Sequence, residues 1–513
     1  RRTGASSHAQ HFSIENFTRI GQCCKSRAPR GAATFRICKF HDVSWASPIE
    51  RNSTNKFVER AQAYPEKRSP DTRRADFLEI GAPFAEDAAR AQAGRCSQCG
   101  VPYCQSHCPL HNHIPDWLRL TAEGRLREAY DLSARTSTMP EICGRICPQD
   151  RLCEGNCVIE FSGHGAVTIG SVEKYLGDNA WENGWVRPIE PGTPTGQSVG
   201  VIGAGPAGLT AAEYLRRAGY EVDIYDRHDR AGGLLIYGIP NFKLDKSVVD
   251  RRVARIEEGG ITIHRGVEVG KDITLAELRE RHDAVFVATG VYQSRELTVD
   301  GADKDGVVRA IDFLTASNRS GLGDEVAEHA DGSLFAKDRD VVVIGGGDTA
   351  MDCVRTAIRQ GATSVKCLYR RDRDNMPGSQ REVANAEEEG VEFVWLSNPK
   401  GFHGDPVTGV VVQRMRLGQP DATGRRSPEA IEGAEYVEEA DLVIKALGFE
   451  PEELPRLWGV DGLEVTRWGT IKADFQTHLT SVPGVYAVGD VISTPQLAHV
   501  GFAEGMFAVR DLL

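Results

Sequence analysis

Two stretches of the chain share one pattern, in which a short apolar run leads into a glycine-rich turn and then an amphipathic helix. The first is SVGVIGAGPAGLTAAEYLRRAGYEVDIYDR, residues 198–227, and the second is DVVVIGGGDTAMDCVRTAIRQGATSVKCLYRR, residues 340–371. Continuous apolar strands followed by helices are typical of parallel sheets that are covered on both faces. The pattern predicts an α/β fold with two Rossmann-like nucleotide-binding domains.

The residues around these two units predict the rest of the organisation. Helical spacing is present over 72–95 and over 114–134, and a Pro/Gly-rich linker covers 186–197. A strand-and-turn signal, VYAVGDV, follows at 485–491. We therefore expect a helical domain over 51–190, a first nucleotide-binding domain over 197–291 and 449–513, and a second one inserted over 292–448.

Charge separates the first 50 residues from the remainder of the chain. The whole chain has a net charge of −12, which argues against a nucleic-acid partner. It contains no apolar run of about 18 residues, so no membrane span is expected. Residues 1–50 hold eight Lys and Arg against three acids, without periodicity or an apolar signal core. We expect an atypical, disordered segment there, with an Arg- and Ser-rich transit peptide as the alternative.

The first glycine-rich turn, GAGPAG, fits the G-x-G-x-x-G pattern of dinucleotide-binding sites. Gly203 permits the tight turn, Gly205 lets a pyrophosphate approach the backbone, and Gly208 lets helix and strand pack closely. The helix N-terminus offers free N–H groups to the phosphates. Asp226 ends the following strand, where a carboxylate accepts a hydrogen bond from a ribose hydroxyl. A lone glycine-rich turn is weak evidence, but here strand, helix and acid follow in order.

Three later features favour FAD over NAD at this first site. A glycine pair that includes Gly233 follows the acid closely, and a strand ends at Thr289 and Gly290 in a turn of small residues. Near the end of the chain, Gly489 precedes Asp490, an acid placed to bind a ribityl hydroxyl. Each feature alone is common in loops, and their order along the chain is what indicates FAD.

The second turn fits G-x-G-x-x-A and predicts an NADPH site. Its predicted nucleotide-binding residues are Gly345, Gly347, Asp348, Thr349 and Ala350. The next strand ends in Arg370 and Arg371 and has no acid there. Guanidinium groups pair with a 2′-phosphate, which a carboxylate would repel. A solvated basic turn is the alternative, because the run RRDRD has mixed charge.

The loop GLLIYGIPNFK lies between the two sites and predicts the reactive region. A loop with glycine and an aromatic residue can lie against a flat isoalloxazine ring, which assigns Tyr237 and Gly238 to the flavin. Lys243 is predicted to stabilise negative charge on the reduced flavin. An ordinary packed loop is the alternative. Cys353 and Cys367 have no closely spaced cysteine partner, so we expect small core residues and not a redox pair.

Eight of the thirteen cysteines fall within 62 residues and form two spaced sets. The sets are Cys96-x2-Cys99-x4-Cys104-x3-Cys108 and Cys143-x3-Cys147-x5-Cys153-x3-Cys157. Thiolates bind iron clusters in fours, and a Cys-Pro pair occurs in both sets. The pattern predicts two [4Fe–4S] clusters in the helical domain, with structural zinc as the runner-up and a disulfide scaffold as a weaker alternative. Reduced thiols in such number also predict a cytoplasmic chain.

These motifs resemble one known family. RCSQCGVPYCQSHCP, EICGRICPQDRLCEGNC, GGLLIYGIPNFKLDK and the second nucleotide unit resemble the small (beta) subunit of NADPH-dependent glutamate synthase, over about residues 64–490. The N-terminal half of dihydropyrimidine dehydrogenase has a related fold. The resemblance implies an electron-input subunit with FAD, NADPH and two [4Fe–4S] clusters. Its partner would be the large (alpha) subunit, which makes L-glutamate from L-glutamine and 2-oxoglutarate.

The resemblance also implies which residues hold each cluster. One cluster would be held by Cys96, Cys99, Cys104 and Cys157, and the other by Cys108, Cys147, Cys153 and Glu173. Cys143 would then not be a ligand. The segment GDVISTPQLAHVGFAEGMFAVRDLL departs from the usual ending of the family and is more similar to that of lipoamide-dehydrogenase-type flavoproteins.

Two other functions stay open from the sequence. One is a self-contained reductase that acts on a small molecule or a ferredoxin through the same cofactors. The other is a non-catalytic cluster scaffold, against which the two intact nucleotide units argue.

Overall fold

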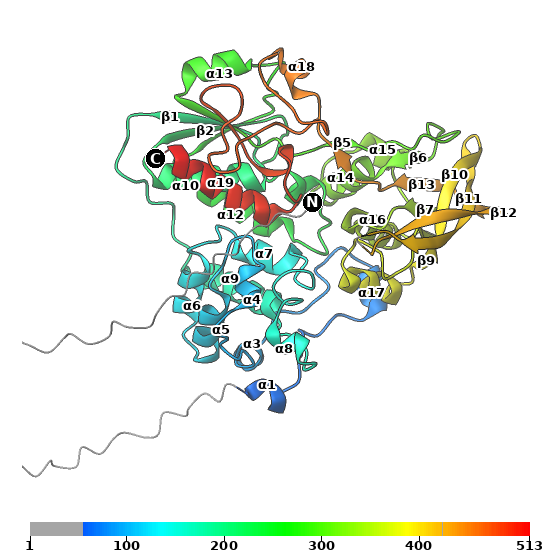
Figure 1. Cartoon of the computed structure of the whole chain (residues 1–513), viewed down its shortest axis with the longest axis horizontal. Helices are drawn as coiled ribbons and strands as arrows, with labels where there is room; N and C mark the ends of the chain where they lie inside the picture. The colour runs from blue at the N-terminus through cyan, green and yellow to red at the C-terminus, as the bar shows by residue number, and fades with distance from the viewer. Residues whose placement is uncertain (1–54, 423, 513) are drawn as a thin grey trace, which may run out of the picture. The chain divides into compact units, whose positions relative to one another are not determined.

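The computed structural model describes residues 55–422 and 424–512. The expected disordered segment, residues 1–50, therefore lies outside the described residues. The described residues belong to one compact unit, in which a helical part is followed by two α/β parts (Figure 1). No helix among them is long and apolar enough to cross a bilayer.

The helical part precedes the first strand and is built from short helices around a small apolar core. Trp117 and Val172 are completely buried in this core. The helices are α1 (Lys56–Glu59), α2 (Pro70–Arg74), α3 (Glu86–Ala93), α4 (Tyr103–Ser106), α5 (Ile114–Ala122), α6 (Leu126–Ser133), α7 (Pro140–Ile146), α8 (Val158–Phe161) and α9 (Ile169–Glu182).

Both helical stretches expected from the sequence are interrupted, which corrects the prediction. Between α2 and α3 the chain is irregular over 75–85, where Pro83 disfavours a helix. Between α5 and α6 the chain turns at Gly124, whose φ is +79°, a conformation that favours glycine. The spacing of apolar residues therefore identified helices, but not where they end.

The first α/β part has a five-stranded parallel sheet in the order β15-β4-β1-β2-β3. Its elements are β1 (Ser198–Ile202), α10 (Pro206–Arg217), β2 (Glu221–Asp226), α11 (Leu234–Tyr237), α12 (Lys246–Glu258), β3 (Thr262–Arg265), α13 (Leu275–Arg281), β4 (Ala284–Val287), α18 (Leu454–Trp458), β15 (Val485–Ala487), the 3₁₀ helix η1 (Gly489–Val491) and α19 (Ala498–Leu512). Because β15 comes from the end of the chain, the second α/β part is inserted into the first, as the sequence predicted.

The second α/β part repeats this design with the order β6-β13-β7-β8-β9. Its elements are β6 (Val307–Arg309), α14 (Ala310–Gly321), α15 (Ala327–Ala330), β7 (Asp340–Ile344), α16 (Asp348–Arg359), β8 (Ser364–Tyr369), α17 (Gln380–Glu388), β9 (Glu392–Trp395) and β13 (Leu442–Lys445). The chain enters this part through β5 (Gln293–Ser294) and leaves it through β14 (Phe449–Glu450), and these two strands pair antiparallel.

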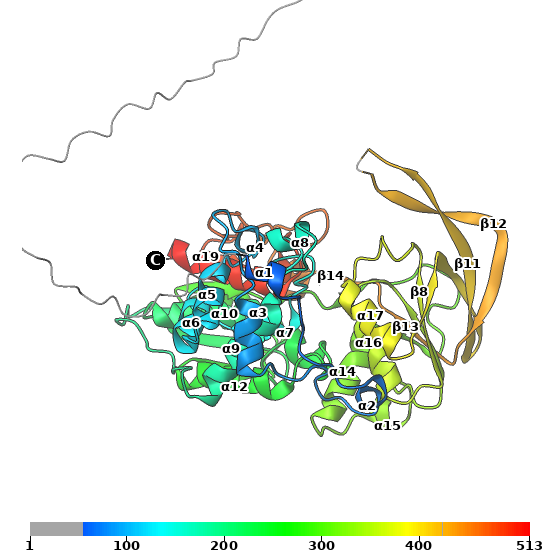
Figure 2. The same ribbon diagram turned by 90° about the horizontal axis from the view of Figure 1, so that it is seen from below.

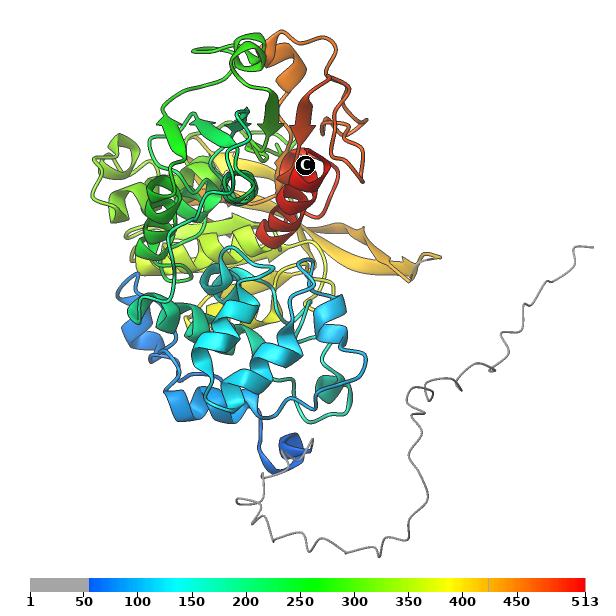
Figure 3. The ribbon, with the colours of Figure 1, turned by 90° about the vertical axis from the view of Figure 1, so that its left-hand side faces the viewer.

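A third, antiparallel sheet was not expected from the sequence. It contains β10 (Ser397–Gly404), β11 (Val407–Pro420) and β12 (Arg426–Glu439). The hairpin of β11 and β12 projects from the second α/β part (Figures 2 and 3). The residues of β12 are exposed or only half-buried, so the strand lacks the apolar face whose alternation would have predicted it.

A buried ion pair joins the helical part to the first α/β part. Arg252 on α12 donates to both carboxylate oxygens of Glu141 on α7, at 2.6 and 2.8 Å, and both side chains are almost completely buried. Trp181 Nε1 also donates to Glu141, at 3.1 Å. Burial would raise the pKa of Glu141, but Arg252 outweighs it and holds that pKa below its usual value. α7 is thereby fixed against α12.

We expect Glu141→Gln to lower the free energy of unfolding by about 3–5 kcal/mol, because the buried guanidinium of Arg252 would lose its counter-charge. Glu128→Gln, which breaks the exposed Arg125–Glu128 pair, should leave the urea midpoint unchanged. The double variant Glu141→Leu/Arg252→Leu should recover most of the loss, since no charge is left buried. Equal shifts of the urea midpoint in Glu141→Gln and Glu128→Gln would show that the buried pair does not stabilise the contact between α7 and α12.

Candidate functional site

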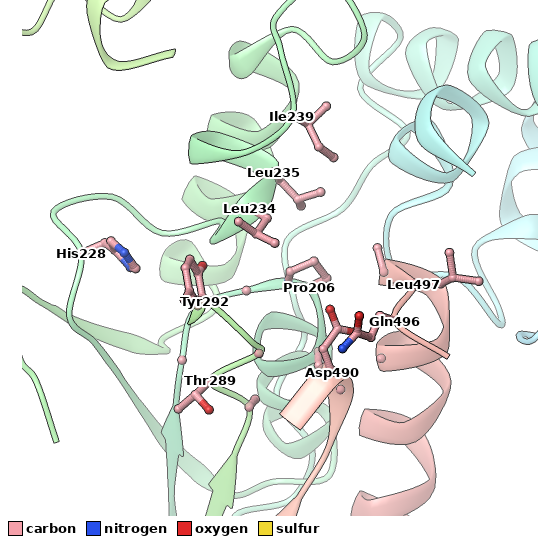
Figure 4. A pocket seen from close by; sticks show the side chains of 18 of the residues that line it. Pro206, His228, Leu234, Leu235, Ile239, Thr289, Tyr292, Asp490, Gln496 and Leu497 are labelled. Carbon is pink, nitrogen blue, oxygen red and sulfur yellow. The ribbon is translucent and has the colours of Figure 1, made fainter. Parts of the chain in front are cut away.

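One cavity of about 590 Å³ reaches all three parts of the described chain. It begins between β1 and β4, where the strand order of the first sheet reverses. Open α/β sheets bind ligands at this kind of switch point, beyond the carboxyl ends of the strands. The lining brings together the first turn (Gly203, Gly205), the second turn (Asp348, Thr349) and the helical part (Cys147, Pro148). Figure 4 shows the side chains near the first turn.

The first glycine-rich turn has the geometry that the sequence predicted. Gly203 has a φ of +107°, and a Cβ there would lie 2.4 Å from the Ala288 carbonyl oxygen. A Cβ at Gly208 would lie 2.0 Å from the Gly203 oxygen, so helix and strand are in close contact. A Cβ at Gly205 would meet nothing within 4 Å. Gly205 thus leaves open space at the N-terminus of α10, which a pyrophosphate can fill.

Asp226 lies at the end of β2, in the cavity lining. Its carboxylate accepts hydrogen bonds from Ala204 N at 2.6 Å and from His228 N at 2.8 Å. The acid therefore braces the first turn as well as facing the cavity. Beside it, Arg227 pairs with Glu452 at 2.8 Å and lies over the Tyr292 ring at 4.9 Å. The sequence did not point to Glu452 and Tyr292, since they come from distant loops.

The turns that follow β4 and β15 add further polar groups to the cavity lining. Thr289 Oγ1 is buried and has no hydrogen-bond partner among the described residues. Burial raises the pKa of Asp490 to about 6. Figure 4 shows both side chains at the cavity, and the adjacent Gly290 and Gly489 have φ values of +67° and +79°. A ligand with several hydroxyl groups, such as a ribityl chain, fits these groups.

The predicted flavin loop lies only partly against the cavity. Gly233 has a φ of +55°, and a Cβ there would lie 3.0 Å from Gly205 Cα, so the loop contacts the first turn. Leu234, Leu235 and Ile239 line the cavity, whereas Tyr237 and Gly238 do not. Tyr237 faces away: its hydroxyl donates to Asp229 and its carbonyl accepts from Asn318 Nδ2 at 2.9 Å. Its contacts join α11 to α14, so the two residues are not where the sequence placed them.

Lys243 lines the cavity but is already ion-paired. Its Nζ lies 2.8 Å from Asp352 Oδ1 and 3.8 Å from Glu382 Oε2, both from the second α/β part. Burial would lower the pKa of Lys243, but these carboxylates outweigh it and hold the pKa above its usual value. The lysine therefore connects the two nucleotide-binding parts as a charged group.

The second turn repeats the geometry of the first. Gly345 has a φ of +145°, and a Cβ there would lie 2.2 Å from the Ala446 carbonyl oxygen. A Cβ at Gly347 would meet nothing within 4 Å, which leaves open space at the start of α16. Asp348 and Thr349 line the cavity, and Ala350 is completely buried behind them.

Two arginines follow the end of β8. Arg370 is exposed and Arg371 is half-buried, with its Nε 3.2 Å from the Tyr369 hydroxyl. Neither forms an ion pair with any described residue, whereas Arg373 nearby pairs with Glu387 at 2.7 Å. Guanidinium groups that are free of a carboxylate at this position suit a 2′-phosphate.

The eight clustered cysteines are free thiols that gather in two groups. In the first, burial together with Cys157 and Cys99 raises the pKa of Cys96 to about 11. Burial together with Cys96 and Cys157 raises that of Cys104 to about 12. These are the four residues that the family resemblance placed around one cluster.

The second group surrounds Cys147. Burial, with Glu173 and Cys143 nearby, raises the pKa of Cys108 to about 12. Burial raises the pKa of Cys153, and Cys108 and Glu173 add to the effect. The pKa of Cys147 is raised by a hydrogen bond with Cys143 and by burial. Glu173, whose own pKa burial and Glu141 raise to about 8, thus belongs to this group, as does Cys143.

No disulfide joins the cysteines of the described ranges. Among the described residues, no three His, Cys, Asp or Glu side chains are arranged to hold a single ion. Cys353 and Cys367 are completely buried in the core of the second α/β part, as predicted.

Two family models match the chain. Residues 73–185 match the 4Fe-4S domain described as dihydropyrimidine dehydrogenase domain II, and residues 197–505 match the pyridine nucleotide-disulphide oxidoreductase domain. Together with the site geometry, they show that the chain is an iron–sulfur protein that binds FAD and NADPH. In fold, the chain is similar to FprA from Mycobacterium tuberculosis in complex with NADPH, with a TM-score of 0.52 and 20% identity over 62% of this chain and 85% of FprA.

Similarity to whole proteins is much higher. The glutamate synthase [NADPH] small chain of Azospirillum brasilense is 61% identical over 89% of this chain and 95% of its own length. The small chain of the same name from Escherichia coli (strain K12) is 45% identical over 89% of this chain and 98% of its own length. The chain therefore belongs to the family of glutamate synthase [NADPH] small chains.

Proposed function

We propose that this chain is the electron-input subunit of a glutamate synthase. It oxidises NADPH at the second turn through FAD at the first turn, and passes the electrons through two [4Fe–4S] clusters to a large subunit that makes L-glutamate. The observation that carries the proposal is the single cavity, whose lining includes both nucleotide turns and Cys147. When bound there, the flavin supplies the hydride chemistry and the conversion to single electrons.

The residues of the chain bind and orient the nucleotides. The open space at Gly205 and Gly347 lets a pyrophosphate approach each helix N-terminus. Arg370 and Arg371 hold the 2′-phosphate of NADPH, and Thr289 and Asp490 bind the ribityl hydroxyls of FAD. Of the residues assigned to catalysis, Lys243 remains, as a cation in the cavity lining that Asp352 and Glu382 hold between the two nucleotide-binding parts. Tyr237 and Gly238 support the loop from behind.

We assign two clusters to the helical part, in the ligand sets that the family resemblance implied. The set of Cys108, Cys147, Cys153 and Glu173 is nearer to the flavin, because Cys147 lines the cavity. Cys153 lies close to both sets, since Cys108 from its own set and Cys104 from the other both raise its pKa. The second cluster, held by Cys96, Cys99, Cys104 and Cys157, then receives the electrons from the first.

The surface beside this second cluster supports electron transfer to a protein partner. Val101, Tyr103 and Phe161, which flank its cysteines in sequence, are 66%, 48% and 69% exposed. Exposed apolar side chains at several positions near these cysteines in sequence suit contact with a protein partner. Thiolate ligands also require a reducing compartment, so we place the chain in the cytoplasm.

The isolated holoprotein should oxidise NADPH with ferricyanide or a tetrazolium dye but form no glutamate until a glutamate synthase large subunit is added. The reason is that the described residues provide two nucleotide sites, while their cysteines are committed to clusters or buried in a core, so none is placed to cleave an amide. The assay measures glutamate by mass spectrometry. Glutamate from the chain alone would favour a self-contained enzyme, and failure to reduce the dyes would refute electron input.

Replacing both Arg370 and Arg371 with Ala should weaken NADPH binding by about 1.5–3 kcal/mol for each charge-assisted hydrogen bond that is removed. NADH binding should change little, because NADH lacks the 2′-phosphate. The matched control is Arg373→Ala, which removes an adjacent arginine that is already paired with Glu387. The measurement is the KM ratio for the two nucleotides, and an unchanged ratio in the double variant would refute the assignment.

Cys99→Ser and Cys147→Ser should each remove one cluster, because each removes a ligand of a different set. FAD should stay bound in both variants, because its assigned site is in the first α/β part. Iron and sulfide analysis should give half the wild-type content in each variant, with a full flavin absorption spectrum. Cys353→Ser is the control, since Cys353 lies in the core of the second α/β part. Full iron retention in either cluster variant would contradict the ligand sets.

A further inference from the structure

His499 contacts a predicted cluster ligand from a different part of the chain. Its Nδ1 lies 3.1 Å from Cys147 Sγ, across 352 residues of sequence. The side chain is 3% exposed, and its other nitrogen, Nε2, has no hydrogen-bond partner among the described residues. Cys147 is therefore the polar partner that orients this imidazole.

His499 lies next to the lining of the cavity to which the flavin is assigned. It lies in the first turn of α19, and its neighbours Ala498 and Gly501 line the cavity, as Cys147 does. It also lies in PQLAHVGFAEG, part of the segment that departs from the usual ending of the family. The contact thus joins the C-terminal helix of the first α/β part to the segment that holds the cluster.

The direction of the hydrogen bond follows from the chemistry of the sulfur. A thiolate bound to iron has no proton to give and can only accept. Nδ1 must then carry the hydrogen and donate it, which leaves Nε2 with a lone pair. Donors to ligand sulfurs withdraw electron density and stabilise the additional negative charge of a reduced cluster.

We propose that His499 is a positioning residue that donates a hydrogen bond from Nδ1 to Cys147 Sγ and thereby raises the reduction potential of the cluster nearer to the flavin. The proposal rests on the proposed function, because it takes Cys147 as a ligand of that cluster. The histidine makes the first cluster a better electron acceptor without touching the nucleotides.

The test is a potentiometric titration of the full-length holoprotein, followed by EPR, with variants at position 499. His499→Phe removes the donor and keeps an aromatic ring. At a fixed potential it should lower the ratio of reduced to oxidised cluster roughly tenfold, which corresponds to about 59 mV for a one-electron couple. The other cluster and FAD should keep their potentials. His499→Asn, whose side-chain N–H can replace Nδ1–H, should restore most of the potential.

The control is His282→Phe, which removes a buried histidine that contacts Tyr225 and Ser198 and no described cysteine. It should leave both cluster potentials unchanged. An unchanged potential in His499→Phe, or an equal shift of both clusters and FAD, would overturn the inference.

A measurement on the wild-type protein decides the matter even where a variant loses its cluster. With ¹⁵N-labelled histidine, pulsed EPR of the reduced protein should show one weakly coupled histidine nitrogen, and its absence would overturn the inference. Failure of the ligand assignment looks different, since Cys147→Ser would then keep all its iron. If Cys147→Ser loses one cluster while His499→Phe leaves the potentials unchanged, the ligand set stands and only the role of His499 falls.

Discussion

The buried pair of Glu141 and Arg252 is the constraint on which the position of Cys147 against the first α/β part depends. α7 carries Glu141 in its first turn and ends immediately before Cys147, so the pair fixes the cysteine against the first α/β part. Two charges buried together repay their loss of hydration only if the hydrogen bonds are complete, and here both oxygens of Glu141 are bonded. The position of Cys147, a proposed cluster ligand, is thus set by an ion pair whose two residues do not line the cavity.

Close packing of α9 against α7 also fixes the position of α7. A Cβ at Gly144 would lie 2.4 Å from Lys174 N, and a Cβ at Gly177 would lie 2.6 Å from Glu141 Cβ. α9, which carries Glu173, therefore approaches α7 more closely than side chains at these glycines would allow. Glu173 is brought beside Cys108 and Cys147 by backbone contact, and its pKa rises because that contact excludes water.

The parts of the fold that could be predicted from sequence are those whose cause is local. The runs before Gly203 and Gly345 are continuous apolar strands followed by glycine turns, and the structure has the predicted parallel sheets there. The pairing of Lys243 could not be predicted, because Asp352 is 109 residues away and belongs to the other nucleotide-binding part. Tyr237 was misplaced for a similar reason: its orientation is set by Asp229 and by Asn318 on α14. Sequence spacing therefore predicted which loops form the cavity, but not which side chains face it.

The second nucleotide turn contains a carboxylate at a predicted phosphate-binding position, and a residue of the helical part neutralises its charge. Asp348 is the first residue of α16 and lines the cavity, where a bare carboxylate would repel a pyrophosphate. Its Oδ2 accepts from Arg151 Nη2 at 2.9 Å, and its Oδ1 accepts from Ser379 N at 2.9 Å. Arg151 lies in the segment between Cys147 and Cys153, and its other Nη donates to the Pro377 carbonyl. The segment that carries two of the proposed cluster ligands thus also neutralises the acid at the nucleotide turn, so direct contacts join the proposed cluster site to that turn.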